Sequence, residues 1–292
     1  MKETYQSEFA ELKSVLLKEP NLAFRNQSYI DANWQELNYL GRPDFRKAQE
    51  EYAKFKEIFT DRGIAVELLE PNETTGMDSI YVRDASITTD QGMLICDMGK
   101  EQRAGEPGAQ LNYYLQHGQN VFGKFTGGAT IEGGDVAWLS PNVLAVARGY
   151  RTNQLGIDQL RHMLNEQGVE VLVMDAPHYK GPSDVFHLMS VLSPIDKDLA
   201  VVYSPLMTVP FREQLLEMGY TFVEVPESEF ESQGCNVLAI APRVCMLIKG
   251  NPITKSRLEA EGVEVIEFDG DEICVKGCGG PTCLTRPLVR AL

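Results

Sequence analysis

The sequence repeats one pattern five times, and this repetition restricts the fold more than any other feature. Each copy has an amphipathic helical run, then a glycine, then a short run rich in β-branched residues. Glycine suits the position after a helix because the left-handed conformation that ends many helices carries no Cβ penalty there. The copies recur at intervals of 43 to 55 residues, at Gly63, Gly118, Gly168, Gly219 and Gly262. Such a period predicts a chain built from successive supersecondary units.

Paired apolar runs with the composition of strands lie between these segments. GDVAWL is followed by NVLAVAR, and NVLAIAP by RVCMLIK. On the same grounds SIYVRDASITT and FHLMSVLS are predicted to be strands. Each copy then reads as a ββαβ unit, and we expect residues 1–292 to form a single α/β domain of five related units, with a closed ring as one arrangement. An ordinary doubly wound α/β sheet is the alternative.

Helix starts are marked by capping residues and prolines. Pro43-Asp44 precedes a helix expected near residues 45–62, and Thr152-Asn153 precedes one near 154–167. Pro252 opens the last expected helix.

The charge of the chain limits its partners. It carries 27 Lys and Arg against 42 Asp and Glu, a formal net charge of −15. Nucleic acids and anionic membrane surfaces attract clustered positive charge, so neither is expected as a partner. No uninterrupted apolar stretch is long enough to span a bilayer, and the N-terminus lacks the apolar region of a secretory signal. We therefore expect a cytoplasmic protein with reduced cysteines.

Two familiar kinds of site are disfavoured by spacing. The glycines of FTGGATIEGGD match neither a dinucleotide-binding fingerprint nor a phosphate-binding loop. Cys274, Cys278 and Cys283 crowd the C-terminus, but no histidine follows them and zinc ligands are usually spaced differently. Zinc binding stays a minor alternative, and we expect no metal and no cofactor.

Two residues are candidates for nucleophile and base. Cys283 follows a Gly-Gly-Pro turn in GCGGPTCLT, a loop that could present a thiol to a substrate. Packing as a small buried hydrophobe is the other interpretation of this cysteine. His187 lies alone in the apolar run FHLMSVLS, and a satisfied core histidine is its alternative interpretation. His178, in the loop DAPHYKG, is a rival candidate.

Two clusters of charged residues are also unusual. Glu132 and Asp135 flank two glycines in IEGGDVAWL, where a carboxylate could orient a histidine or cap its own turn. Asp78, Arg83 and Asp84 interrupt an expected strand. Asp78 and Asp84 are an even number of residues apart, so on a strand both would project from one face. Paired carboxylates of this kind suit a cationic, fork-shaped ligand.

Together, Cys283 in GGPTCLT, His187 in HLMS, Glu132 in EGGD and Asp84 in DSIYVRD resemble the guanidine-modifying, or pentein, superfamily. This superfamily includes arginine deiminases, amidinotransferases and dimethylarginine dimethylaminohydrolases, and the chain most resembles the last branch. LGRPDFRKAQEEY, EQRAGEP and ARGYRTN add to the resemblance, which extends from about residue 12 to the end. The resemblance implies a five-bladed pseudo-symmetric α/β propeller of ββαβ units.

The resemblance also implies roles for individual residues. Cys283 would attack the guanidinium carbon, His187 would move protons, and Glu132 would orient His187. Asp84 would hold the guanidinium. The other expected contacts with substrate lie elsewhere in the chain: Arg103 and Arg151 at the α-carboxylate, Asp78 near the α-amino group, and Trp34 within a mobile lid formed by residues 28–40.

The implied reaction is a hydrolysis through a covalent thiouronium. A methylated arginine, giving citrulline and methylamine or dimethylamine, is the expected substrate. Met189 stands where deiminases carry an acid two residues after the histidine, and an apolar residue there would tolerate methyl groups. Arg83 and GGPTCLT are closer to the deiminases, so deimination or dihydrolysis of arginine, or amidino transfer, stays open. A non-catalytic amino-acid-binding module is a further alternative, and a homodimer is left open.

Overall fold

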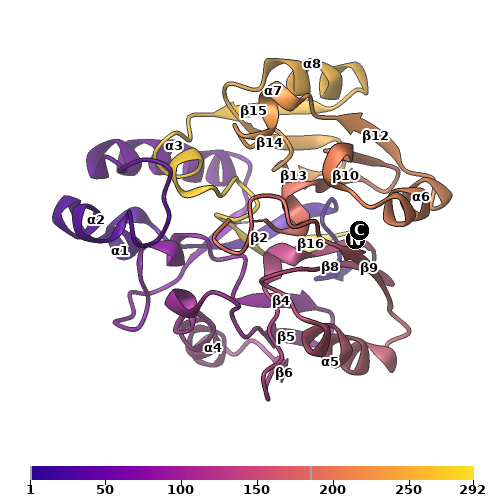
Figure 1. Ribbon diagram of the computed structural model, residues 1–292, viewed down its shortest axis with the longest axis horizontal. Coiled ribbons are helices and arrows are strands. Elements are labelled where there is room, and N and C mark those ends of the chain that lie inside the picture. Colours follow the sequence, from indigo (N-terminus) through magenta and orange to yellow (C-terminus); the bar gives the residue numbers. More distant parts are fainter. Residues whose placement is uncertain (1, 185) are drawn as a thin grey trace.

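A computed structural model describes residues 2–184 and 186–292 of the chain. Its strands form five small sheets grouped about a common centre, and the longer helices lie on the periphery (Figure 1). This is the α/β propeller that the resemblance implied. Four of the sheets have three strands each, in the orders β4-β5-β6, β7-β8-β9, β10-β11-β12 and β13-β14-β15. The fifth has four strands, in the order β1-β16-β2-β3.

The strand bounds follow the chain through these sheets. They are β1 (Glu3–Thr4), β2 (Glu11–Leu17), β3 (Ala65–Leu68), β4 (Ser86–Thr89), β5 (Gly92–Ile95), β6 (Val121–Lys124), β7 (Val136–Ser140), β8 (Val143–Arg148), β9 (Glu170–Asp175), β10 (Leu192–Asp196), β11 (Leu199–Val202), β12 (Thr221–Glu224), β13 (Leu238–Ala241), β14 (Val244–Ile248), β15 (Glu264–Phe268) and β16 (Arg286–Ala291). The helices are α1 (Pro20–Ala23), α2 (Gln27–Asn33), α3 (Phe45–Asp61), α4 (Glu106–Gln116), α5 (Gln154–Asn165), α6 (Val209–Glu217), α7 (Glu227–Phe230) and α8 (Pro252–Ala260).

Each sheet repeats the same connections. Its first two strands pair antiparallel, and a helix then leads to a third strand that pairs parallel with the second, as in β7, β8 and β9. The five predicted glycines all follow the helix of their unit and all have positive φ, between 67° and 90°. The left-handed turn therefore occurs where the repeat predicted it. The caps are also confirmed, because the side chains of Asp44 and Asn153 accept hydrogen bonds from Lys47 N and Gly156 N.

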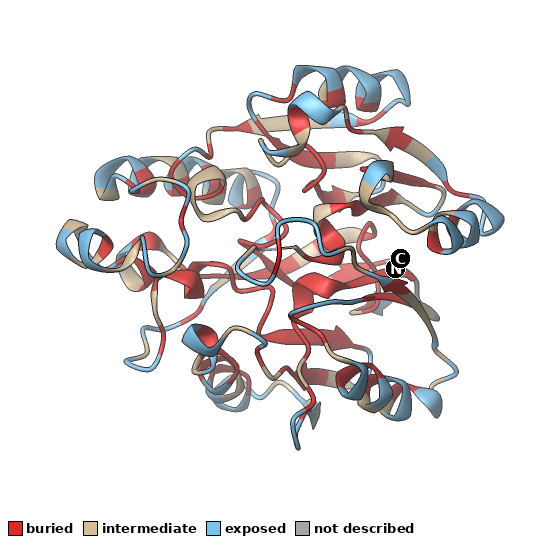
Figure 2. Cartoon of the chain, viewed as in Figure 1, coloured by how far each residue is buried: buried red, intermediate tan, exposed pale blue. Residues whose placement is uncertain are grey.

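Middle strands and the inner faces of the helices supply the core. All four residues of β11 are buried, as are four of the five in β14. Figure 2 shows buried strands at the centre and exposed outer helix faces. The buried residues of α3 recur with the helical period and so lie on one face. They are Ala48, Tyr52, Phe55 and Phe59.

The two ends of the chain complete one sheet. β16 pairs antiparallel with β2, placing Arg286 opposite Leu16, and β1 pairs with β16. Both termini therefore lie side by side (Figure 1). The sheet that contains the first helix–glycine–strand segment takes its antiparallel partner from the far end of the sequence.

Two predicted strands are shorter than expected. Met77–Ile80 forms a 3₁₀ turn, and β4 begins only at Ser86, so Asp78 and Asp84 do not share a strand face. Likewise His187 precedes a 3₁₀ turn (Leu188–Ser190) and β10 begins at Leu192. Polar partners explain the second departure: Ser190 Oγ accepts from His187 N, and Asp135 Oδ1 accepts from Leu188 N. These bonds replace the strand ladder that the apolar pattern predicted.

Candidate active site

Each of the five units delivers one polar side chain to the centre from the segment just before its first strand. Asp84 precedes β4, Glu132 precedes β7 and His187 precedes β10. Asn236 precedes β13, and Cys283 precedes β16. All five side chains are buried. The repeat therefore explains why residues far apart in sequence meet: they occupy corresponding positions in successive units.

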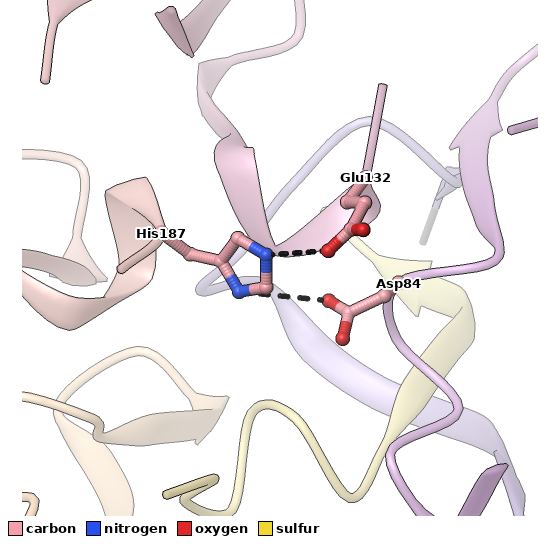
Figure 3. A group of neighbouring side chains, drawn as sticks. All are labelled: Asp84, Glu132 and His187. Carbon is pink, nitrogen blue, oxygen red and sulfur yellow. Dashed lines mark hydrogen bonds and ion pairs between the residues drawn. The ribbon is translucent and has the colours of Figure 1, made fainter. Parts of the chain in front are cut away.

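His187 and Glu132 form a short pair. Nε2 of His187 lies 2.7 Å from Oε2 of Glu132 (Figure 3). The other oxygen of Glu132 accepts hydrogen bonds from the backbone N–H groups of Gly99 and Lys100, at 3.0 and 3.2 Å. These bonds fix the carboxylate, which in turn fixes the orientation of the imidazole ring.

The charges of this pair hold both groups ionised. Burial alone would lower the pKa of His187, but the negative charges of Asp84, Asp135 and Glu132 outweigh it and raise this pKa to about 9. Burial would raise the pKa of Glu132, yet the hydrogen bond and charge of His187 lower it to about 2. His187 is therefore an imidazolium at neutral pH, ready to donate a proton.

Only one carboxylate oxygen of Asp84 has a hydrogen-bond partner. Its Oδ2 accepts a hydrogen bond of 2.5 Å from Nη1 of Arg103. Its Oδ1 is buried without a hydrogen-bond partner and lies 4.0 Å from Nδ1 of His187 (Figure 3). A buried, unpaired carboxylate oxygen is costly, so it marks a place where a cationic donor is expected to bind.

Cys283 is a free, buried thiol held by neighbouring amides. Asn236 Nδ2 lies 3.4 Å from its Sγ, and Asn236 Oδ1 accepts from the backbone N and the hydroxyl of Thr282. Burial, followed by the charge of Asp84, raises the pKa of the Cys283 thiol. A cation bound at Asp84 would offset both effects and favour the thiolate.

Arg83 connects the segment that carries Asp84 to the loop that carries Cys283. Its backbone N donates to Cys283 O, and its Nε donates to Thr282 O at 2.9 Å. The guanidinium pairs with Glu8 through two hydrogen bonds, at 3.2 and 3.0 Å. Arg83 therefore points into the core and positions the Cys283 loop next to Asp84.

A narrow cleft opens onto these groups. The structure brings together six of the residues singled out in the sequence, while Glu132 lies directly behind His187. The six are Asp78, Asp84, Arg103, Arg151, His187 and Cys283. Leu37 and Asn38 of the expected lid also line the cleft. Trp34 does not; it packs, partly buried, against the hydrophobic core.

A second set of charges also lines the cleft. Lys100 Nζ donates to Asp78 Oδ2 at 2.6 Å and to Leu37 O at 3.0 Å. Arg103 is committed to Glu106, through Nε at 2.9 Å and Nη2 at 2.7 Å, in addition to Asp84. Arg151 approaches the oxygens of Glu132 only at 3.4 and 3.5 Å.

Two residues of the site were missed from the sequence. Asn236 could have been found by asking which polar side chain precedes the first strand of the fourth ββαβ unit, as His187 does in the third. Lys100 gave no signal, because it looks like one of many charged residues in a polar loop.

Other sequence candidates lie outside the cleft. His178 is exposed, its Nδ1 contacts the hydroxyl of Tyr150, and it is not among the described residues that line the cleft with Cys283. Met189 is buried in the hydrophobic core and is not among the described residues that line the cleft. Its position gives no support to the expectation that it accommodates methyl groups.

The only group of metal-ligating side chains with suitable distances among the described residues is Asp84, Glu132 and His187, whose ligand atoms lie within 4.8 Å of one another. A cation shared by all three would have to compete with the 2.7 Å bond between Glu132 and His187. Within this part of the chain the C-terminal cysteines do not form such a group, so the structure gives the zinc alternative no support.

A five-bladed α/β propeller with a cysteine, a histidine and two carboxylates at its centre defines a class of enzymes that modify guanidino groups. The solved structure of dimethylarginine dimethylaminohydrolase from Pseudomonas aeruginosa, complexed with citrulline, is similar to this chain with a TM-score of 0.76 and 22% identity. The alignment covers 94% of this chain and 98% of that one. At this identity the likeness concerns the fold.

The chain also has relatives in sequence. An uncharacterized Bacillus subtilis protein, YkgA, is 27% identical over 245 residues, 84% of this chain and 81% of its own length. An arginine deiminase of Mycobacterium marinum is 29% identical over 249 residues, 72% of this chain. The aligned part is 60% of the length of that deiminase.

The family described as "N,N dimethylarginine dimethylhydrolase, eukaryotic" matches residues 21–290, and the chain belongs to this family. It is an enzyme of the hydrolase class that acts on C–N bonds of amidines. None of the helices described, over residues 2–184 and 186–292, has the length and apolar character needed to cross a membrane.

Proposed function

We propose that the chain hydrolyses the guanidino group of an arginine derivative through a covalent intermediate on Cys283. The observation that carries this proposal is that Oδ1 of Asp84 has no hydrogen-bond partner, while Asp84 lines the same cleft as Cys283 and His187. A guanidinium supplies donors in a planar fork that matches a carboxylate. Bound there, it would bring its central carbon to the thiol.

The first half of the reaction replaces an amine with sulfur. The Cys283 thiolate attacks the guanidinium carbon and forms a C–S bond. His187, protonated at the outset because of its raised pKa, gives its proton to the leaving nitrogen. The C–N bond then breaks, the amine departs, and a cationic S-alkylthiouronium remains on Cys283.

The second half replaces sulfur with oxygen. Neutral His187 takes one proton from a water that attacks the thiouronium carbon. The C–S bond breaks as the ureido carbonyl forms, which regenerates the thiolate. The second proton of the water is released and protonates the departed amine. No oxidant, metal or cofactor enters this balance.

A turnover panel at neutral pH tests the reaction. Wild-type protein and Cys283→Ser are incubated with arginine, mono- and dimethylarginine, agmatine and guanidinoacetate, and the products are identified by mass spectrometry. We expect a ureido product and an amine with wild type, a thiouronium adduct on Cys283, and neither with Cys283→Ser. Turnover that persists in Cys283→Ser would overturn the mechanism.

The panel also separates the candidate substrates. The family description favours methylated arginine, which would give citrulline plus methylamine or dimethylamine. The likeness to arginine deiminase favours ammonia release from arginine, so this is the second candidate. Added glycine or ornithine that becomes amidinated would instead indicate an amidinotransferase. Binding without turnover would indicate a non-catalytic binding module.

We further propose a cytoplasmic location, which is supported by the six free cysteines.

Sedimentation of the purified chain tests the homodimer that the sequence left open.

A further inference from the structure

The side chain of Lys100 fills a part of the cleft where two acceptors would suit a substrate ammonium. Its Nζ contacts Asp78 Oδ2 at 2.6 Å and Leu37 O at 3.0 Å. A carboxylate and a carbonyl are the acceptors that a protein offers to an ammonium group. Both are therefore already bound to an ammonium group, and it belongs to the chain itself.

Lys100 is not a loose surface lysine. Only 10% of its side chain and 10% of that of Asp78 are exposed. Its backbone N–H donates to Glu132 Oε1 at 3.2 Å, so the residue is held at its backbone by the catalytic carboxylate and at its tip by Asp78. Displacing Nζ would break a largely buried ion pair and leave the lysine ammonium without its carboxylate partner.

A free α-amino group would meet a second difficulty. With Lys100 in place, its ammonium would have to share Asp78 with another cation at contact distance. Like charges in a narrow, partly dry cleft repel more strongly than they do in water. The structure therefore disfavours a zwitterionic amino acid in this part of the cleft.

A carboxylate, by contrast, would find unused donors. Arg103 is occupied by Glu106, by Asp84 and by Tyr81 O. Among the described residues lining the cleft, the cations with spare capacity are Lys100, which uses two of its three N–H donors, and Arg151, whose contacts with Glu132 are long. Both would attract a substrate anion.

We infer that the cleft prefers a guanidino compound with a carboxylate and without a free α-ammonium over the corresponding free amino acid, and that Lys100 fills the place of that ammonium and binds the carboxylate together with Arg151. This class includes ω-guanidino carboxylic acids and arginine whose α-nitrogen is acylated. The inference rests on the proposed hydrolysis, but it concerns the opposite end of the substrate. It is therefore independent of methylation at the terminal nitrogen.

A matched pair of ligands tests the inference. Arginine and 5-guanidinopentanoate differ only in the α-ammonium, and each is used in unmethylated and Nω,Nω-dimethylated form. Binding to Cys283→Ser is measured by calorimetry, and turnover is measured with the wild-type nucleophile. We expect the compound without the ammonium to bind at least tenfold tighter than its amino-acid counterpart.

Two lysine variants complete the design. Lys100→Met keeps the length of the side chain and removes its charge, and it should tighten the amino acid at least tenfold while weakening 5-guanidinopentanoate. Lys47→Met, on an exposed face of α3, should leave both affinities unchanged. Circular dichroism and thermal melting establish that each variant is folded.

The outcomes are distinguishable. Tighter binding of the amino acid, or an affinity ratio that Lys100→Met does not change, would overturn the inference. Selective binding of the compound without the ammonium, together with no ureido product from wild type, would support the inference and overturn the proposed function. Failure of all four ligands to bind would overturn both.

Discussion

The two carboxylate oxygens of Asp84 have different surroundings, and this difference determines where a guanidinium is expected to bind. One oxygen is paired with Arg103, and the other has no hydrogen-bond partner and faces the thiol and the imidazole. Burial and then the charge of Asp84 raise the thiol pKa, and the Asp84 oxygen without a hydrogen-bond partner offers a place for a cation. Substrate binding and thiol ionisation are thus linked through one carboxylate.

Replacing Asp84 with asparagine should separate these two effects. Loss of a charge-assisted hydrogen bond of about 1.5–3 kcal/mol should reduce kcat/KM about ten- to hundredfold. The thiol pKa should fall, because one cause of its elevation is removed. The thiol is titrated by thiolate absorbance, as the difference from a matched Cys283→Ser protein. Asp158→Asn, exposed on α5, is the control, and an unchanged thiol pKa in Asp84→Asn would contradict the coupling.

The pair of His187 and Glu132 should make stability depend on pH. The pKa of Glu132 is lowered from 4.5 to about 2, so its stabilisation is present above pH 4.5 and is lost as the pH falls toward 2. The pKa of His187 is raised from 6.5 to about 9, so its stabilisation is present below pH 6.5 and is lost as the pH rises through 9.

The difference in unfolding free energy between wild type and Glu132→Gln should therefore be largest between about pH 4.5 and 6.5. Denaturant titrations across the pH range measure this difference. A difference that grows from pH 7 to 9 would show that His187 is neutral in the folded protein.

At the level of elements, the glycine-containing segment between Glu132 and β7 lets the functional side chains approach one another. Gly134, between Glu132 and β7, has no room for a Cβ. A methyl group there would lie 2.6 Å from both Asp84 Oδ1 and His187 Nδ1. The glycine is thus required by the closeness of these two side chains.

Gly134→Ala should push Asp84 and His187 apart and lower kcat/KM about a hundredfold, the effect expected of a displacement near 1 Å. Gly108→Ala is the matched control, because a Cβ there meets nothing within 4 Å. As Gly108 is an exposed position of α4, this change should raise stability by about 0.5–1 kcal/mol and leave activity intact. Full activity of Gly134→Ala would show that the cleft tolerates the wider spacing.

At the level of the whole molecule, the ring depends on its last strand. β16 lies between β1 and β2, and Leu292 N donates to Lys2 O. Arg286 and Arg290 of β16 are buried, and their charges act on Glu8. We propose that the chain folds as one cooperative unit because its two ends share this sheet.

Because the two ends of the chain share one sheet, a truncation and a circular permutation should have opposite outcomes. Deletion of residues 286–292 should abolish cooperative thermal unfolding, because β2 loses its antiparallel partner. A circular permutant that joins residue 292 to residue 2 by a short linker and opens after the exposed Gly168 should fold and keep its activity within a fewfold. Cooperative melting of the truncated chain would contradict the proposal.

Local sequence signals determined the repeat, the five left-handed glycines and the caps at Asp44 and Asn153, because each depends on neighbours a few residues away. The resemblance identified Cys283, His187, Glu132 and Asp84 as one set. Only the tertiary structure decided the closure by β16, the 3₁₀ turns and the pairing of Lys100 with Asp78. These depend on contacts between residues that the chain separates, by 22 positions for Lys100 and Asp78 and by 55 for His187 and Glu132. No pattern within one segment encodes such contacts, since the partners are chosen by the packing of different units around the centre.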